Sequence, residues 1–165
     1  MNLARLLKIS DFITFLNATA GLLCIFLAYM GEFQLAVIAL FAAVVFDYFD
    51  GRSARKRKIA NEFGKELDSL SDIISFGVAP VAFVFMFLGD IRFAPIYIVF
   101  VLSGLIRLAR FNITKAEGYF HGMPITVNGV IVPIFYLFKA TPLVYYVYFI
   151  LASVLMVSSV RFKKV

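Results

Sequence analysis

Six apolar runs, separated by short polar segments, divide this chain of 165 residues. They lie at about 12–30, 33–49, 73–89, 93–106, 123–138 and 143–160. A membrane hydrocarbon core is crossed by about 20 apolar residues in a helix, and basic side chains at helix ends can extend somewhat shorter runs. Hydrophobic residues make up 62% of the chain and charged residues only 16%, which is unlike a soluble domain. We therefore expect an all-α integral membrane protein with six transmembrane helices, forming a single domain over residues 1–165.

The basic residues are distributed unequally between the two sides of such a six-span chain. Fourteen of the 16 Lys and Arg residues fall on the side that holds both termini, while Arg92 and Lys139 fall on the other. Because segments rich in Lys and Arg stay in the cytoplasm, we expect a multi-pass protein of the cell membrane with both termini cytoplasmic. The net charge of +6 then reflects topology and contact with anionic membrane lipids, and no nucleic-acid partner is expected.

The N-terminal sequence MNLARLLK begins with a positive charge, but no small-residue cleavage site closes the apolar run that follows it. We expect this segment to form a short interfacial amphipathic helix that leads into the first span. Cys24 is the single cysteine, so it predicts neither an internal disulfide nor a cysteine-based metal site. Asn17 and Asn128 are polar residues in apolar runs, and each predicts either an interhelical hydrogen bond or a ligand contact.

Two pairs of carboxylates flank the polar segment between the second and third runs. Asp47 and Asp50 are three residues apart, and Asp68 and Asp72 are four apart, so each pair lies on one face of a helix. Two antiparallel helices can bring the pairs together, where each close pair would repel by several kcal/mol at an effective dielectric constant of roughly 20. Oxygen ligands favour Mg²⁺, Mn²⁺ or Ca²⁺, and four carboxylates suit two metal ions about 4 Å apart that hold a phosphoryl group.

Small residues and an arginine lie between the two acidic pairs. Gly51, Ala54 and Gly64 allow a nucleotide or phosphate to approach the backbone closely, and Arg55 offers a guanidinium group to phosphate oxygens. From Asp47 to Asp72 the stretch follows the pattern D-x2-D-G-x2-A-R-x8-G-x3-D-x3-D. With each specified letter expected at roughly 5–8%, such a match occurs by chance on the order of once in 10¹⁰ at a given start.

This pattern resembles the signature of the CDP-alcohol phosphotransferase family without a departure at any specified position. The resemblance implies six transmembrane helices, cytoplasmic termini and an N-terminal interfacial helix, and often a homodimer. It also implies a metal-dependent enzyme that moves a phosphatidyl-type group from a CDP-activated lipid onto an alcohol and releases CMP at the cytoplasmic membrane face. Two divalent ions, Mg²⁺ or Mn²⁺, would be bound by the four aspartates Asp47, Asp50, Asp68 and Asp72.

The resemblance also implies individual roles around the nucleotide. Asp72 would be the catalytic proton acceptor, Gly51 and Arg55 would hold the CDP group, and Ala54 would leave room for it, while Gly64 would shape the turn before the third helix. Two further CDP-lipid contacts are expected at Asn61, where the family often has Ser or Thr, and at Thr14. Thr14 belongs to an N-x-x-T element of the family, in which this chain has Asp11 in place of the Asn.

The acceptor alcohol is suggested by other segments. SDFITFLNATAGLLCIFLA, LDSLSDIISFGVAP, RLARFN and FHGMPI resemble the corresponding segments of the membrane-integral phosphatidylserine synthases of this family. We therefore expect L-serine as acceptor, with a diacyl (phosphatidyl) or ether-linked (archaetidyl) donor. Arg107 and Arg110 would supply the positive charge for the serine carboxylate, and Asn112 belongs to the same acceptor segment. The alternative is that these arginines anchor the chain at lipid phosphates.

Four other interpretations stay open from the sequence. A sibling enzyme would use the same chemistry with glycerol 3-phosphate or inositol phosphate as acceptor. A divalent-cation transporter is the alternative of a different class, because clustered carboxylates in membrane helices also mark ion pathways. The purely structural interpretation is a salt-bridge network between Asp47, Asp50 and the basic residues that follow them. A lipid-binding scaffold without catalysis is the alternative that fits the eight-letter match least well.

Overall fold

The protein is described by a computed structural model that covers residues 9–57, 62–113, 119–158 and 161–163, with side chains described over 11–52, 62–113 and 122–158. The elements, in chain order, are α2 (Ile9–Tyr29), α3 (Phe33–Arg57), α4 (Glu62–Asp72), the π-helix η1 (Ile73–Val78), α5 (Ala79–Leu88), the 3₁₀ helix η2 (Ile91–Phe93), α6 (Ala94–Ile113), β1 (Tyr119–His121), the 3₁₀ helix η3 (Ile125–Val127), α7 (Asn128–Leu137), α8 (Pro142–Val157) and β2 (Arg161–Lys163). The predicted interfacial helix lies outside the described residues.

Among the described residues, four helical segments are long and apolar enough to cross a membrane, as expected of a helical membrane protein. They span Asp11–Tyr29, Phe33–Arg52, Glu62–Leu88 and Ile91–Ile113. The last two predicted spans correspond to shorter apolar helices, Ile125–Leu137 and Pro142–Val157. At about 1.5 Å per residue, each of these is shorter than a hydrocarbon core.

β1 and β2 form a small antiparallel pair, in which Phe120 is opposite Phe162 and which the amino-acid pattern did not predict. This pair ties the segment after α6 to the segment after α8. Helices nonetheless form nearly all of the described chain, as predicted.

The third span is one continuous rod, because α4, η1 and α5 follow each other without a break. The π-helical segment begins directly after Asp72 and ends two residues before Pro80. Proline lacks the backbone N–H that an α-helix needs and its ring crowds the carbonyl four residues earlier, and a wider turn relieves both problems. We attribute the π-helix to Pro80, and it fixes the rotation of Asp68 and Asp72 relative to the apolar half of the rod.

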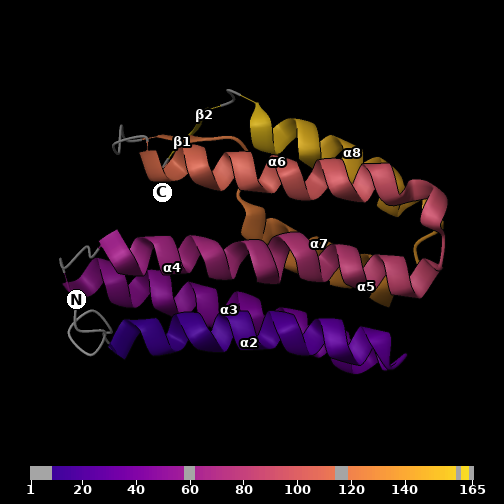
Figure 1. The fold of residues 1–165 in the computed structure, drawn as a ribbon, viewed down its shortest axis with the longest axis horizontal. Coiled ribbons are helices and arrows are strands. Elements are labelled where there is room, and N and C mark those ends of the chain that lie inside the picture. Colours follow the sequence, from indigo (N-terminus) through magenta and orange to yellow (C-terminus); the bar gives the residue numbers. More distant parts are fainter. Residues whose placement is uncertain (1–8, 58–61, 114–118, 159–160, 164–165) are drawn as a thin grey trace.

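The helices form two layers with α7 between them (Figure 1). α2 runs along α3 and also contacts α4, η1 and α5, while α6 packs on α8 and α7 contacts α3, α5 and α8. Small residues allow the close approaches. A Cβ atom at Gly21 of α2 would lie 2.7 Å from the backbone Cα of Ser75, and one at Gly129 of α7 would lie 2.6 Å from the Phe76 ring. These positions therefore bring α2 and α7 against η1.

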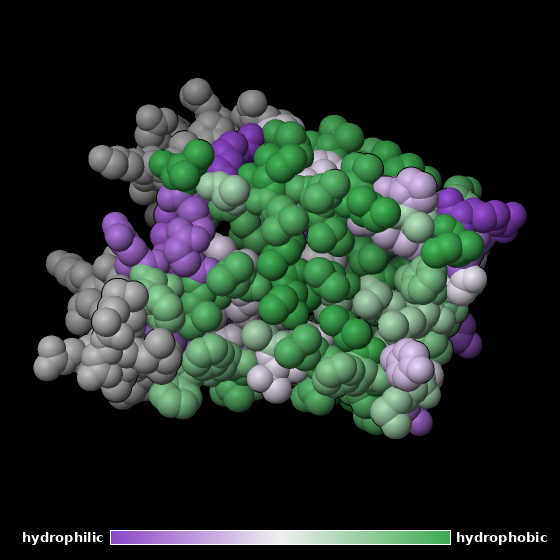
Figure 2. Space-filling model, viewed as in Figure 1, coloured by the Kyte–Doolittle hydropathy of each residue, from purple (hydrophilic) through white to green (hydrophobic). Residues whose placement is uncertain are grey.

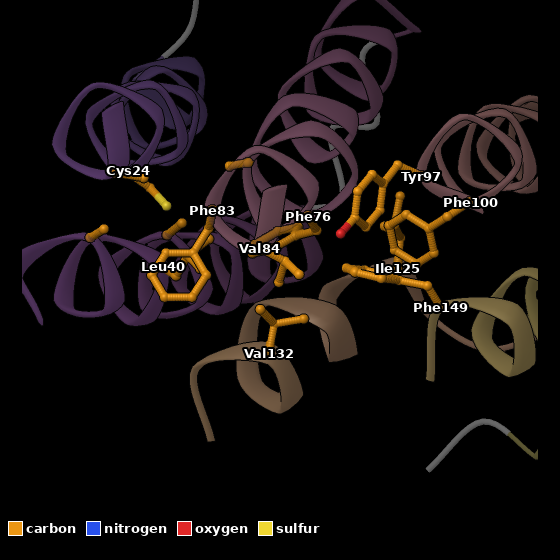
Figure 3. Close-up of a cluster of buried hydrophobic side chains, with 14 of the residues drawn as sticks. Cys24, Leu40, Phe76, Phe83, Val84, Tyr97, Phe100, Ile125, Val132 and Phe149 are labelled. Carbon is orange, nitrogen blue, oxygen red and sulfur yellow. The ribbon is translucent and has the colours of Figure 1, made fainter. Parts of the chain in front are cut away.

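The core is apolar and aromatic. Leu40, Phe76, Phe83 and Val132 from α3, η1, α5 and α7 meet with 0% exposure each (Figure 3). Apolar side chains also cover much of the outer surface, whereas hydrophilic residues gather toward the two ends of the helices (Figure 2). An apolar belt with polar ends is the arrangement expected of a protein that spans a lipid bilayer.

Candidate active site

A cavity of about 460 Å³ lies between α3, α4, α6 and the η3–α7 segment. Its polar lining consists of Asp47, Tyr48, Asp68, Ser69, Asp72, Arg107 and Thr126, and the rest of the wall is apolar side chains together with Gly51. The cavity is therefore a charged pocket in an otherwise mainly apolar protein. It lies near the end of the bundle where α3 ends and α4 begins, the left-hand end in Figure 1.

Three carboxylates converge in this cavity. Asp47 comes from α3, and Asp68 and Asp72 come from successive turns of α4. Each offers an oxygen atom, and the three atoms all lie within 4.8 Å of one another. The two antiparallel helices thus bring the acidic pairs together, as the spacing predicts. α3 continues to Arg57, so Asp47 lies inside the helix, several turns before its end.

Asp50, one turn after Asp47, lies at the edge of this group. Its carboxyl group is close enough to Asp68 to interact with it, and its side chain is 7% exposed. Thr14 of α2 donates a 2.7 Å hydrogen bond to Asp50 Oδ2. Among the described residues, Asp50 Oδ1 has no hydrogen-bond partner. Thr14, expected from the resemblance to contact the CDP-lipid, is thus buried against a carboxylate.

The first helix supplies a second polar contact that sequence reasoning left open. Asn17 Nδ2 donates a hydrogen bond of 3.3 Å to Asp72 Oδ1, and Asn17 is 1% exposed. Two serines of the third rod fix this helix in place, because Ser71 Oγ donates to Thr14 O at 3.0 Å and Ser75 Oγ donates to Asn17 O at 2.9 Å. The available signal was a polar residue at three-residue spacing from Thr14 in an apolar run.

Arg107 of α6 is the cation of the cavity. It is 8% exposed and interacts electrostatically with Asp72 and Asp47. Its guanidinium carbon lies 5.5 Å from the centre of the Phe111 ring. Within the described part of the chain, Arg107 Nε has no hydrogen-bond partner. A buried arginine with a free donor is expensive to keep in a membrane protein, and it points to a ligand with acceptor oxygens.

The other two predicted acceptor residues are placed differently. Arg110 directs its guanidinium group to carbonyl groups at the C-terminal end of α8, with bonds of 3.0 Å to Val157 O, 3.2 Å to Met156 O and, just after the helix, 3.1 Å to Ser158 O. It therefore caps a helix whose last carbonyls lack partners of their own. Arg110 comes three positions after Arg107 on the same helix, yet the two side chains contact different neighbours.

Asn112 joins α6 to α4. Its Nδ2 donates to Glu66 Oε2 at 3.0 Å, and its Oδ1 accepts from Ser69 Oγ at 3.1 Å. Lys65 Nζ donates to Asn112 O at 2.6 Å. The asparagine thus holds the first turns of α4 beside the end of α6, next to the cavity that Ser69 lines.

The predicted nucleotide residues are described in part. Gly51 lines the cavity, and Gly64 lies in the first turn of α4 rather than in the connection before it. Ala54 and Arg55 belong to the last turns of α3, but their side chains lie outside the described set, and Asn61 lies outside the described residues altogether. Their predicted contacts with the CDP group stay predictions.

The carboxylate cluster has the composition of a divalent-cation site. Its ligand atoms are all carboxylate oxygens, which suit Mg²⁺ or Mn²⁺ better than zinc. Arg107 supplies one positive charge against the negative charges of Asp47, Asp68 and Asp72, with Asp50 beside them, so most of the repulsion is left uncompensated. The buried free oxygen of Asp50 is a further available ligand atom. The residues therefore fit a metal centre.

Comparison with known protein families matches residues 7–162 to the CDP-alcohol phosphatidyltransferases. The chain belongs to this family. The match confirms the resemblance that the acidic pattern carried, and it identifies the protein as a membrane-integral transferase of phospholipid biosynthesis. Three of the four acidic positions of the signature, Asp47, Asp68 and Asp72, line the cavity.

Individual relatives indicate which members of the family the chain resembles. The chain is 39% identical over 165 residues to "Archaetidylserine synthase" of Methanothermobacter thermautotrophicus, covering 96% of this chain and 71% of that protein. It is 34% identical over 163 residues to "CDP-diacylglycerol--serine O-phosphatidyltransferase" of Methanocaldococcus jannaschii, covering 99% and 77%. A protein of the same name from Bacillus subtilis is 34% identical over 154 residues, covering 91% of this chain and 86% of its own length. Among CDP-alcohol phosphatidyltransferases, the chain thus resembles those that carry serine in their names.

Proposed function

We propose that this enzyme transfers a phosphatidyl or archaetidyl group from a CDP-activated membrane lipid to the hydroxyl group of L-serine and releases CMP. The observation that carries the proposal is the cavity in which Asp47, Asp68 and Asp72 converge within 4.8 Å and which Arg107 also lines. An acidic centre suits the diphosphate of the donor once cations are present, and a buried arginine suits an acceptor with a carboxylate. The names of the relatives support serine as acceptor.

The metal centre is assigned to Asp47, Asp50, Asp68 and Asp72. Two Mg²⁺ or Mn²⁺ ions bound there would neutralise the diphosphate and the developing charge on the leaving CMP. The role of the protein is then to hold the carboxylates in position. Asp47 and Asp68 fix the cluster from two helices, Thr14 orients Asp50, and Asn17 holds one oxygen of Asp72 through its amide.

In the transfer step, the serine hydroxyl oxygen forms a bond to the lipid-bearing phosphorus, and the bond from that phosphorus to the oxygen of CMP breaks. CMP leaves with the electron pair of the broken bond. Asp72 accepts the hydroxyl proton through its carboxylate and later passes it to water. Arg107 pairs with the serine carboxylate through its free Nε–H and so presents the hydroxyl group to the donor.

The donor's nucleotide is assigned to the end of α3 and the connection after it. Gly51 provides backbone access at the cavity wall, and the family resemblance assigns CDP contacts to Ala54, Arg55 and Asn61 as well. Gly64, in the first turn of α4, lets the chain approach the nucleotide without a side chain in the way. The lipid tails stay in the hydrocarbon beside the apolar outer faces of the helices.

The topology proposed is six spans with both termini and the cavity facing the cytoplasm. The unequal distribution of Lys and Arg supports this orientation. The two shorter helices, Ile125–Leu137 and Pro142–Val157, complete the six crossings if the membrane is thinner around them or the flanking residues enter the interface. A homodimer, which the family resemblance implies, stays a prediction.

A direct assay tests this function. The purified full chain is incubated in detergent micelles with CDP-archaeol or CDP-diacylglycerol, Mg²⁺ or Mn²⁺, and one acceptor at a time: L-serine, glycerol 3-phosphate, inositol phosphate or myo-inositol. Release of CMP that depends on L-serine is the expected result. Release with a phosphorylated acceptor instead would keep the chemistry and reject serine. Divalent-cation flux into vesicles without CMP release would favour a transporter and reject the transfer.

A further inference from the structure

The end of the bundle opposite the carboxylate cluster contains three helix ends with left-handed backbone. Gly31 follows α2 with a φ of 80°, Gly89 follows α5 with a φ of 67°, and Lys139 follows α7 with a φ of 52°. In the described ranges, Lys139 is the one residue other than glycine with a positive φ. A side chain destabilises this conformation relative to glycine, which is why glycine is the usual residue there.

The hydrogen bonds after α7 are those of a helix end that ordinarily takes glycine. Lys139 N–H donates to Tyr136 O at 3.0 Å, and Ala140 N–H donates to Phe135 O at 2.9 Å. In this closing motif, the residue in the position of Lys139 is usually glycine and sometimes asparagine. Lysine carries an ammonium group that glycine lacks, so we expect this group to have a function that offsets the backbone strain.

The lysine side chain borders a groove of about 670 Å³ that is otherwise mainly apolar. One wall is a face of α3 formed by residues at helical spacing, Gln34, Val37, Ile38 and Phe41. The other wall comes from the ends of α5 and α7, with Phe87 and Tyr136 among its residues. From Gln34 to Phe41 the groove follows α3 for about 10 Å. Two of its polar side chains, Gln34 and Lys139, are exposed at the end of the bundle.

No described carboxylate pairs with the ammonium group of Lys139. Arg92, the other basic residue predicted for this end, forms a salt bridge of 2.8 Å with Asp90. Among the described residues, no carboxylate lies within 4.0 Å of the Lys139 ammonium group. The groove therefore combines an uncompensated cation at the membrane edge with an apolar channel that leads from it into the hydrocarbon region. That combination matches the phosphate and the acyl or isoprenoid chain of a phospholipid.

We propose that this groove is a phospholipid-binding site, with the lipid phosphate at the Lys139 ammonium group and one hydrocarbon chain along α3 between Val37 and Phe41. The bound lipid bridges α3, α5 and α7 at the end of the bundle away from the carboxylate cluster. It stabilises the folded protein and does not take part in transfer. The proposal is independent of which alcohol the enzyme uses.

The test uses the full chain purified in detergent and freed of lipid. Thermal unfolding and native mass spectrometry are recorded with added phosphatidylglycerol, with diacylglycerol of the same chains, and with inorganic phosphate alone. We expect phosphatidylglycerol to raise the melting temperature by several degrees and to remain bound in the mass spectrum, while the other two additions have much smaller effects.

Two substitutions at one position separate binding from folding. Lys139→Gly removes the charge and relieves the left-handed backbone, so the lipid-free protein is at least as stable as wild type, yet its affinity for phosphatidylglycerol falls at least tenfold. Lys139→Gln removes the charge and keeps the backbone strain, and it loses the same affinity. Arg92→Gln is the matched control, because it removes a basic residue at the same end that is already paired, and it keeps the wild-type response.

Three results would overturn the proposal. Unchanged phosphatidylglycerol binding by Lys139→Gly excludes the lysine as the phosphate contact. Equal stabilisation by diacylglycerol reduces the groove to a non-specific apolar surface, and stabilisation by inorganic phosphate alone removes the role of the hydrocarbon chain. A loss of dimer mass in Lys139→Gly, with no lipid lost, assigns the groove to a second copy of the chain instead.

Discussion

The side-chain amide of Asn17 donates a hydrogen bond of 3.3 Å to Asp72 Oδ1, joining residues that are 55 positions apart in the sequence. Asn17 is 1% exposed, and within the described residues its own Oδ1 has no partner. Because Ser71 and Ser75 already bond the backbone of α2, the amide is not needed to hold the helix in place. The first helix therefore reaches the proposed proton acceptor directly.

Replacing Asn17 by Ala should slow turnover about tenfold to a hundredfold. The substitution removes a donor that holds Asp72, and the loss of a hydrogen bond to a charged group is worth about 1.5–3 kcal/mol. The KM for the CDP-lipid should change little, because the amide contacts the carboxylate and not the nucleotide. Steady-state CMP release at varied donor concentration measures both quantities. Thr19→Ala, on the exposed side of the same helix, is the control and should match wild type; an equal fall in both variants contradicts the prediction.

Asp72→Asn and Asp68→Asn should fail in different ways. Asp72→Asn removes the proton acceptor, and turnover should drop by about 10² to 10⁴ while CDP-lipid binding is retained. Asp68→Asn removes a ligand from the middle of the cluster and should weaken Mn²⁺ binding itself. Electron paramagnetic resonance titration with Mn²⁺ and equilibrium binding of a CDP-lipid separate these effects. Equal loss of Mn²⁺ affinity in both variants would show that the two aspartates do not divide the work in this way.

Substitutions of the two arginines of α6 should also have different effects. Arg107→Ala is expected to raise the KM for serine by about tenfold or more, because a buried cation with a free N–H faces the cavity. Arg110→Ala is expected to leave that KM nearly unchanged and to lower the melting temperature by several degrees, because three carbonyl groups at the C-terminal end of α8 lose this partner. Kinetics and thermal unfolding of both variants decide, and a serine effect confined to Arg110→Ala would reverse the assignment.

Gly21 should be intolerant of side chains. A Cβ atom there lies 2.7 Å from the Ser75 Cα, so Gly21→Val must push α2 away from η1. We expect a destabilisation of about 1–3 kcal/mol and slower turnover, since the same contact positions Asn17 and Thr14. Thermal unfolding and CMP release measure the two effects. Gly31→Ala is a useful comparison, because a Cβ at Gly31 meets no neighbouring atom and only its positive φ resists the change. Full activity with unchanged stability in Gly21→Val would refute the close contact.

Much of the candidate site followed from spacing alone. Asp47 with Asp50, and Asp68 with Asp72, share helix faces by three- and four-residue intervals, and a short connection makes their helices antiparallel neighbours. These are local rules, so the convergence of Asp47, Asp68 and Asp72 could be predicted without coordinates. The exact helix types within the third span could not be predicted in this way. The π-helix after Asp72 depends on how Pro80 and its neighbours pack.

By itself the sequence determined the membrane class, the acidic pattern and the family, because hydrophobic content and residue spacing are properties of consecutive residues. Only the tertiary structure decided that Thr14 and Asn17 contact Asp50 and Asp72, and that Arg107 enters the cavity while Arg110 caps α8. The physical reason is that the partner of a buried polar group is chosen by which helix packs beside it, and that choice is made by contacts between residues far apart in the chain.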